Sequence, residues 1–204
     1  QPDTPLLHGL RVYYYREVQV EPVVPFEAQV LYQDGHIVVA DKPHFLPVMP
    51  GGKYLQNTLL IRLKNQLGLP DLSPVHRIDR DTAGLVLFSI NKSERGAYQA
   101  LFRERTVHKS YEAIAPYDPA IAFPREHASR MAESDSFIRM QEVPGAPNSW
   151  TRMQVLEHNT RWARYLLEPI SGKRHQLRVH MAALGLGLKG DGLYPLVDDA
   201  PEGD

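Results

Sequence analysis

Short segments rich in valine, isoleucine and tyrosine recur along this chain, and tight turns separate several of them. β-Branched and aromatic residues favour strands, and two such segments joined by a short turn pair as an antiparallel hairpin. The clearest turn is Gln33-Asp34-Gly35, between residues 30–32 and 36–40. Further strands are predicted at residues 11–20, 84–90, 107–115, 151–156 and 162–167. Short connections between so many strands limit the chain to a largely antiparallel sheet.

Amphipathic spacing predicts helices at residues 57–67, 93–103 and 174–184. In the first of them Leu59 and Leu63 share a face, Asn57 is the predicted N-cap, and Gly68 ends the helix. Residues 116–150 instead carry many proline, glycine, serine and charged residues, and we expect a long excursion with at most short strands. The prediction is an α+β fold, with a mixed and mostly antiparallel sheet flanked by helices.

Length and composition predict one main domain, because 204 residues of which 43% are hydrophobic can form one substantial core. We expect residues 1–25 to be a lead-in with one strand and residues 26–197 to be the catalytic domain. Residues 198–204 form an acidic tail with Asp198, Asp199, Glu202 and Asp204. Without these four carboxylates the formal net charge changes from −1 to +3. Any contact with nucleic acid must therefore come from local basic clusters.

Several classes of protein are disfavoured by what the sequence lacks. No apolar run reaches the roughly 18–20 residues of a membrane span, and the first residues do not resemble a signal peptide. There is no cysteine, which fits a reducing cytoplasm and excludes thiolate chemistry. Dinucleotide-binding, phosphate-loop and nucleophile-elbow glycine motifs are also missing.

The nine histidines do not predict a metal site. His175 and His180 are five residues apart, which places them roughly 140° apart around a helix or on opposite faces of a strand. No His-Glu-x-x-His or comparable cluster occurs elsewhere in the sequence. We therefore predict that the protein binds no metal.

The most informative stretch runs from Val75 to Leu85 (VHRIDRDTAGL). It places Asp79 between two arginines, in a turn that leads into an apolar strand, and the cations favour the ionised carboxylate. A loop at the end of a rigid strand is a good mounting for a reactive group. An ordinary surface salt bridge is the alternative reading of such a run.

This stretch resembles a family signature. His76 to Leu85 (HRIDRDTAGL) is similar to the His-Arg-Leu-Asp-Arg-Asp/Glu-Thr-Ser-Gly-Leu motif of the RluA-type RNA pseudouridine synthases. Lys109 to Ala113 (KSYEA) and Gly172 to His180 (GKRHQLRVH) resemble two further motifs of that family, in the expected order. Residues 37–43 and 190–194 fit more weakly.

The resemblance implies a role for individual side chains. Asp79 corresponds to the essential aspartate, and Arg178 to the arginine that pairs with it, here expected to be bidentate. Tyr111 corresponds to the tyrosine that packs on the target base and is a candidate acceptor of the C5 proton. Leu177 corresponds to an apolar neighbour beneath the base. Arg80 matches a position that helps to open the RNA.

The resemblance also implies a pseudouridine-synthase-like domain with a central active-site cleft and an RNA substrate, either ribosomal or transfer RNA. It implies no cofactor, and we expect a monomer. The residues expected to bind substrate are Arg77, Arg80, Leu177, His76, Lys109 and His175. Further cations that could line an RNA path are Arg62, Lys64, Arg103, Arg105, Arg161, Arg164, Lys173 and Arg174.

The chain departs from the family pattern in places. Ile78 and Ala83 replace the commoner leucine and serine, and residues 44–47 (HFLP) replace a short turn of the Ala-Gly-Leu type. Only about 25 residues precede the core, fewer than the small RNA-binding domain of many relatives needs, so we expect the catalytic domain itself to bind RNA. A non-catalytic RNA-binding module and a carboxylate glycosidase are the alternatives, and the second would need a paired acid.

Overall fold

A tight hairpin begins the first sheet of the protein. The computed structural model describes residues 20–136 and 138–194. Strands β1 (Gln29–Gln33) and β2 (Ile37–Lys42) pair antiparallel. The Asp34 side chain accepts hydrogen bonds from the backbone N–H groups of His36 and Ile37, at 2.7 and 2.8 Å. An aspartate in this position fixes the turn, and the predicted hairpin is confirmed.

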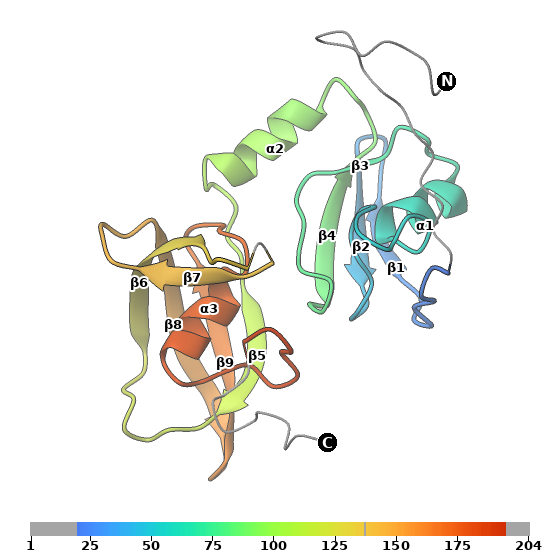
Figure 1. The fold of residues 1–204 in the computed structure, drawn as a ribbon. Coiled ribbons are helices and arrows are strands. Elements are labelled where there is room, and N and C mark those ends of the chain that lie inside the picture. Colours follow the sequence, from blue (N-terminus) through green and yellow to red (C-terminus); the bar gives the residue numbers. More distant parts are fainter. Residues whose placement is uncertain (1–19, 137, 195–204) are drawn as a thin grey trace, which may run out of the picture.

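Two more strands and one helix complete this half of the molecule (Figure 1). The strands are β3 (Ser73–Pro74) and β4 (Gly84–Ser89), and the sheet order is β1-β2-β4-β3 with antiparallel neighbours. Helix α1 (Leu59–Leu67) buries Leu59 and Leu63 in the same hydrophobic cluster as Val38, Ala40 and Phe88. The predicted apolar face of α1 is therefore the face that meets the core.

Helix α1 begins one residue later than the sequence suggested. The Thr58 hydroxyl, rather than the Asn57 side chain, accepts the hydrogen bond of the Ile61 backbone N–H. The Asn57 side-chain oxygen Oδ1 instead accepts a hydrogen bond from Arg62, at 3.3 Å. Gly68 ends the helix with a φ of 67°, a left-handed conformation that glycine adopts without steric cost.

The second half of the chain forms a five-stranded antiparallel sheet. Its order is β5 (Tyr111–Pro116), β9 (Trp162–Pro169), β8 (Ser149–His158), β6 (Arg125–Glu133) and β7 (Met140–Val143). Helix α3 (Gln176–Ala183) contacts four of these strands. Met181 of α3 is buried with Met153, Tyr165 and Leu167 in a second hydrophobic cluster. The predicted hairpin of β8 and β9 is confirmed.

The prediction for residues 116–150 was wrong about strand length, because β6 is nine residues long. Burial alternates along β6, as it does in any strand with one covered face. The covered positions include His127 and Ser129, which are polar, and only Met131 is both apolar and buried. The alternation is therefore one of burial and not of hydropathy, and a search for alternating apolar residues misses it.

The strands are divided between two sheets rather than joined in one, and the described pairings are all antiparallel. Helix α2 (Arg95–Arg103) and the segment after it separate β4 from β5 (Figure 1), so β5 pairs with β9 instead. The α+β prediction itself is confirmed. Residues 11–19 of the segment expected as a strand, and the tail at 198–204, lie outside the described residues, and Val20 is not in a strand.

Observed boundaries differ slightly from those predicted. Helices expected from residues 93 and 174 begin at 95 and 176, and the strand expected from residue 107 begins at 111. Among the residues described, no helix is both long and apolar enough to cross a membrane.

The half-buried His76 and the buried His180 predict how stability depends on pH. Burial lowers the pKa of His76 and of His180 to about 4, whereas a histidine in an unfolded chain titrates near ~6.5. The His76 Nε2 atom already accepts a hydrogen bond from the Leu87 backbone N–H, at 3.1 Å. A second proton on that imidazole would displace this donor.

Between pH 6.5 and 4 the unfolded chain therefore takes up protons that the folded chain does not. We expect the free energy of unfolding to fall as the pH decreases through this range, by up to ~1.4 kcal/mol per pH unit for each such histidine. Urea denaturation at pH 7 and pH 5 measures the slope, and His76→Gln should reduce it by about one proton. His36→Gln, a substitution at an exposed position, is the control. An unchanged slope in His76→Gln would contradict the assignment.

Candidate active site

Asp79 lies in the loop that connects β3 to β4. The loop closes as a turn, because the Thr82 backbone N–H donates to the Asp79 carbonyl oxygen at 3.2 Å. Gly84 then begins β4 with a φ of 122°, a backbone conformation that residues with a Cβ rarely adopt. These local features place the Asp79 side chain in the loop before the first residue of β4, and 28% of it is exposed.

A buried lysine holds this loop in place. The Lys42 ammonium has no solvent exposure and donates to the carbonyl oxygens of Pro43, Leu46 and Arg80, at 3.0, 2.8 and 3.0 Å. Burial lowers the pKa of Lys42 to about 8, although the carboxylates of Asp81 and Asp79 act in the opposite direction. Because three carbonyl groups satisfy its three protons, Lys42 ties the end of β2 to the Asp79 loop. In the sequence, Lys42 is part only of the weak match at residues 37–43.

Arg178 on α3 joins Asp79 to a second carboxylate. The Arg178 Nη1 atom lies 2.9 Å from Asp79 Oδ2. Its Nε and Nη2 atoms each lie 2.7 Å from one oxygen of Asp191. The bidentate contact expected for Asp79 is therefore made with Asp191, and Asp79 receives a single hydrogen bond. One guanidinium can serve both because its N–H donors point in fixed, separate directions.

The charges in this triad stabilise one another. Burial acts to lower the pKa of Arg178, but its hydrogen bonds to Asp191 and Asp79 outweigh burial and raise it. Burial acts to raise the pKa of Asp191, whereas Arg178 and the backbone N–H groups of Leu193 and Tyr194 lower it overall. Although Asp191 is only 5% exposed, these partners keep it ionised beside Arg178. The weak sequence match at residues 190–194 includes Asp191 but assigns no function to its side chain.

Tyr111 is the first residue of β5 and is partly buried against the second hydrophobic cluster. Burial raises the pKa of its phenol, and the negative charge of Asp79 raises it further. The phenol therefore keeps its proton at neutral pH. A neutral aromatic ring near the Asp79 carboxylate offers a flat apolar surface rather than a charge.

His175 approaches the same carboxylate from the start of α3. Its Nε2 atom lies 3.8 Å from Asp79 Oδ2, and its Nδ1 atom lies 2.9 Å from the Tyr194 hydroxyl. That hydroxyl also accepts the Met140 backbone N–H at 2.9 Å, and it can donate its own proton to Nδ1. In that tautomer the ring proton lies on Nε2, the nitrogen nearer to Asp79. Burial lowers the pKa of His175 although Asp79 opposes this, so the ring is neutral.

Three of the other residues expected to bind substrate, His76, Lys109 and Leu177, make contacts within the protein. The His76 ring stacks on Phe102 with centroids 4.5 Å apart and supports β4 through the Leu87 backbone. Lys109 donates to the Ser171 carbonyl oxygen at 3.0 Å, which supports the turn before α3. Leu177 packs on the second hydrophobic cluster.

Two arginines of the Asp79 loop are exposed. Arg80 forms an ion pair with its neighbour Asp81 at 2.7 Å. Arg77 borders an open pocket beside α1 and α2, which Lys64 and Arg95 also line. Of the cations considered for an RNA path, Arg62 and Arg164 already bind protein groups: Arg62 donates to backbone carbonyls, and Arg164 pairs with Glu112 and Glu157.

Comparison with known proteins agrees with this geometry. The family model described as RNA pseudouridylate synthase matches residues 36–183. An uncharacterized RNA pseudouridine synthase of Synechocystis sp. is 34% identical over 197 residues, which cover 95% of this chain and 67% of that protein. The dual-specificity RNA pseudouridine synthase RluA of Escherichia coli O6:H1 is 34% identical over 170 residues, which cover 81% of this chain and 76% of that protein.

Solved structures show the same fold. Human RNA pseudouridylate synthase domain containing 1 superposes with a TM-score of 0.72 and 26% identity, over 88% of this chain and 74% of that one. Human RNA pseudouridylate synthase domain containing 4 superposes with a TM-score of 0.65 and 31% identity, over 81% and 68% of the two chains. The sequence matches and the shared fold agree, and the chain belongs to the RluA-type family of RNA pseudouridine synthases, enzymes that isomerise uridine to pseudouridine.

Proposed function

We propose that the protein isomerises uridines of ribosomal or transfer RNA, and that the Asp79 carboxylate acts on a uridine that has been flipped out of the RNA. The supporting observation is the ion pair of Asp79 with Arg178, at 2.9 Å, on a carboxylate that is still 28% exposed. A catalytic carboxylate needs a fixed orientation and an open side, and this one has both. Base flipping is required because C1′ and C6 of a stacked nucleotide are inaccessible, and it costs a few kcal/mol.

The reaction balances without any cofactor. The N1–C1′ bond of uridine breaks, the uracil turns, and a C5–C1′ bond forms while the C5 proton is lost and N1 gains a proton. Asp79 can add to C1′ or to C6 as a nucleophile, or remove the C2′ proton as a base. Each route requires an ionised carboxylate, and Arg178 provides a charge-assisted hydrogen bond to it at 2.9 Å.

Tyr111 and His175 complete the proposed site. The neutral Tyr111 ring would pack on the extruded uracil, and stacking on an aromatic ring contributes about 1–3 kcal/mol per base. The raised pKa of Tyr111 favours this packing role over a resting phenolate that removes the C5 proton. The neutral His175 ring, with Nε2 3.8 Å from Asp79 Oδ2, would border the same carboxylate.

RNA would be bound by the catalytic domain through the exposed cations around the Asp79 loop. Arg77, Lys64 and Arg95 border one pocket, and Arg80 lies beside the catalytic aspartate. Contacts of this kind bind phosphates and set the register of the RNA. A monomeric state and a cytoplasmic location are part of the same proposal.

The second carboxylate near Asp79 does not support the interpretation of the protein as a glycosidase. That carboxylate is Asp191, which binds the same arginine. A glycosidase needs a protonated acid beside its nucleophile. The lowered pKa and low exposure of Asp191 exclude it as a proton donor.

The first prediction concerns Asp79. Asp79→Asn keeps the size of the side chain and removes its charge, and we expect the rate of tritium release from RNA labelled at uridine C5 to fall by at least about 10³-fold. Labelled ribosomal and transfer RNA are tested in separate reactions. Asp135→Asn, at an exposed position of the β6–β7 turn, is the matched control and should keep the native rate. Substantial release by Asp79→Asn would remove Asp79 from the mechanism, and release from neither RNA would contradict the proposed substrate class.

The second prediction concerns Tyr111. Tyr111→Phe keeps the ring and removes the hydroxyl, so we expect binding of RNA to change by less than about threefold because stacking is preserved. Turnover should slow if the hydroxyl takes part in proton transfer. Binding by fluorescence anisotropy and single-turnover rates separate the two effects. A native rate would confine Tyr111 to stacking, whereas a large loss of binding would contradict the packing role.

The third prediction concerns Asp191 as a positioning residue. Asp191→Asn retains an oxygen for the Leu193 and Tyr194 backbone N–H groups but loses the charge that orients Arg178. We expect kcat to fall about 10- to 100-fold with little change in KM, because Arg178 no longer fixes the Asp79 carboxylate. Circular dichroism checks that the variant is folded. A change in KM alone, with native kcat, would show that Asp191 does not act on the chemical step.

A further inference from the structure

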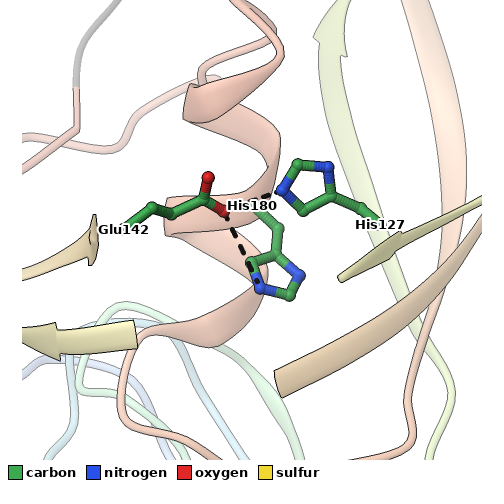
Figure 2. A group of neighbouring side chains, drawn as sticks. All are labelled: His127, Glu142 and His180. Atoms are coloured by element: carbon green, nitrogen blue, oxygen red, sulfur yellow. Dashed lines mark hydrogen bonds and ion pairs between the residues drawn. The ribbon is translucent and has the colours of Figure 1, made fainter. Parts of the chain in front are cut away.

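A second group of ionisable side chains lies outside the active site. Figure 2 shows His127 of β6, Glu142 of β7 and His180 of α3 pointing toward one another. Each offers one ligand atom, and these atoms all lie within 4.8 Å of one another. The three residues are far apart in sequence, so the tertiary structure alone brings them together.

The distances in this cluster suit a metal ion of the size of zinc. The Glu142 Oε1 atom lies 2.7 Å from His127 Nε2 and 4.0 Å from His180 Nε2. Ligand atoms about 2.1 Å from a tetrahedral zinc ion lie roughly 3.4 Å from one another. One observed separation is shorter and the other is longer, so small side-chain rotations would reach this geometry.

The burial of the three ligands also fits a binding site. The His180 side chain has no exposure, His127 is 16% exposed and Glu142 is 27% exposed. The buried imidazole is neutral, because burial disfavours the charged form, and a neutral imidazole is the form that binds metals. The partial exposure of Glu142 makes its carboxylate accessible from solvent.

Hydroxyl groups around His180 can hold it in the ligating tautomer. The His180 Nδ1 atom lies 2.9 Å from the Thr151 hydroxyl oxygen, which also accepts a hydrogen bond from Gln176. If Nδ1 carries the proton, it donates to Thr151 and leaves the Nε2 lone pair free for a metal. The Ser129 and Ser149 hydroxyls, 3.1 and 3.0 Å from Nε2, can then turn their protons away. A second hydrogen-bonded layer of this kind is usual behind metal-binding histidines.

We propose that His127, Glu142 and His180 form a binding site for one divalent transition-metal ion, with Zn²⁺ as the ion that best matches two imidazoles and one carboxylate. Mg²⁺ and Ca²⁺ are disfavoured, because both prefer sites made of oxygen ligands. The bound ion would fasten α3 to the β6–β7 hairpin and so support the helix that carries Arg178. This proposal does not depend on the proposed function. It also replaces the prediction, made from sequence spacing, that the protein binds no metal.

The test uses the full chain after treatment with a chelator and removal of the chelator. Zn²⁺ is titrated in competition with a chromophoric chelator of known affinity. We expect one ion per chain with a dissociation constant below about 10 μM. His127→Gln and Glu142→Gln should each weaken binding by at least about tenfold, because each removes one of three ligands.

His36→Gln is the matched control. His36 and Glu94 form another histidine–glutamate pair, at 2.9 Å, which is exposed and does not belong to the three-residue cluster. This variant should bind Zn²⁺ like the native chain. Equal affinity in all three variants, or no saturable binding by the native chain, would overturn the proposal and leave a simple ion pair between His127 and Glu142.

A second measurement on the unaltered chain covers the case in which a variant fails to fold. Co²⁺ in place of Zn²⁺ should give the intense visible absorption of a tetrahedral site, and ¹⁵N-labelled histidine spectra should show changes at Nε2 of two imidazoles. Weak octahedral Co²⁺ absorption, or spectral changes spread over many histidines, would indicate adventitious binding and contradict the proposal. Neither readout depends on catalytic activity.

Discussion

The placement of Arg178 between two carboxylates is the interaction on which the candidate active site depends. Asp79 belongs to the loop beside the first sheet, whereas Arg178 and Asp191 belong to the second half of the chain (Figure 1). Burying one partner of such a triad alone would leave an uncompensated charge, which costs about 3–5 kcal/mol. The bidentate contact with Asp191 fixes the guanidinium, and the single contact with Asp79 leaves that side chain 28% exposed. Asp191 therefore holds Arg178 in place, whereas Asp79 remains partly exposed to solvent.

Helix α3 is supported at its start and in its middle by buried polar groups rather than by apolar packing alone. Near its start, Gln176 binds the Thr151 hydroxyl and the Trp150 carbonyl oxygen. Further along, His180 lies among the hydroxyls of Ser129, Ser149 and Thr151. Buried polar networks of this kind cost free energy unless every group is satisfied, and they then specify one arrangement. Such an arrangement suits a helix whose task is to hold one arginine at a fixed position.

Some of the fold follows directly from local patterns. The β1–β2 hairpin and helix α1 were predicted because Asp34, Gly68 and the leucines of α1 act through neighbours in sequence. Strand β6 was underestimated because polar residues occupy its covered positions, next to α3. The N-cap of α1 was placed one residue early because Arg62 binds the Asn57 side chain. In each miss, a contact formed in the folded state overrides a local preference.

The sequence by itself determined the family and the candidate reactive groups, because the run around Asp79 and the segments around Tyr111 and Arg178 are contiguous motifs. Only the tertiary structure decided how those groups are held. It showed that Asp191 takes the bidentate contact of Arg178, that buried Lys42 ties down the Asp79 loop, and that His127, Glu142 and His180 meet at one point. Contacts between residues as distant as these depend on how two sheets and a helix pack together, and no spacing along the chain encodes them.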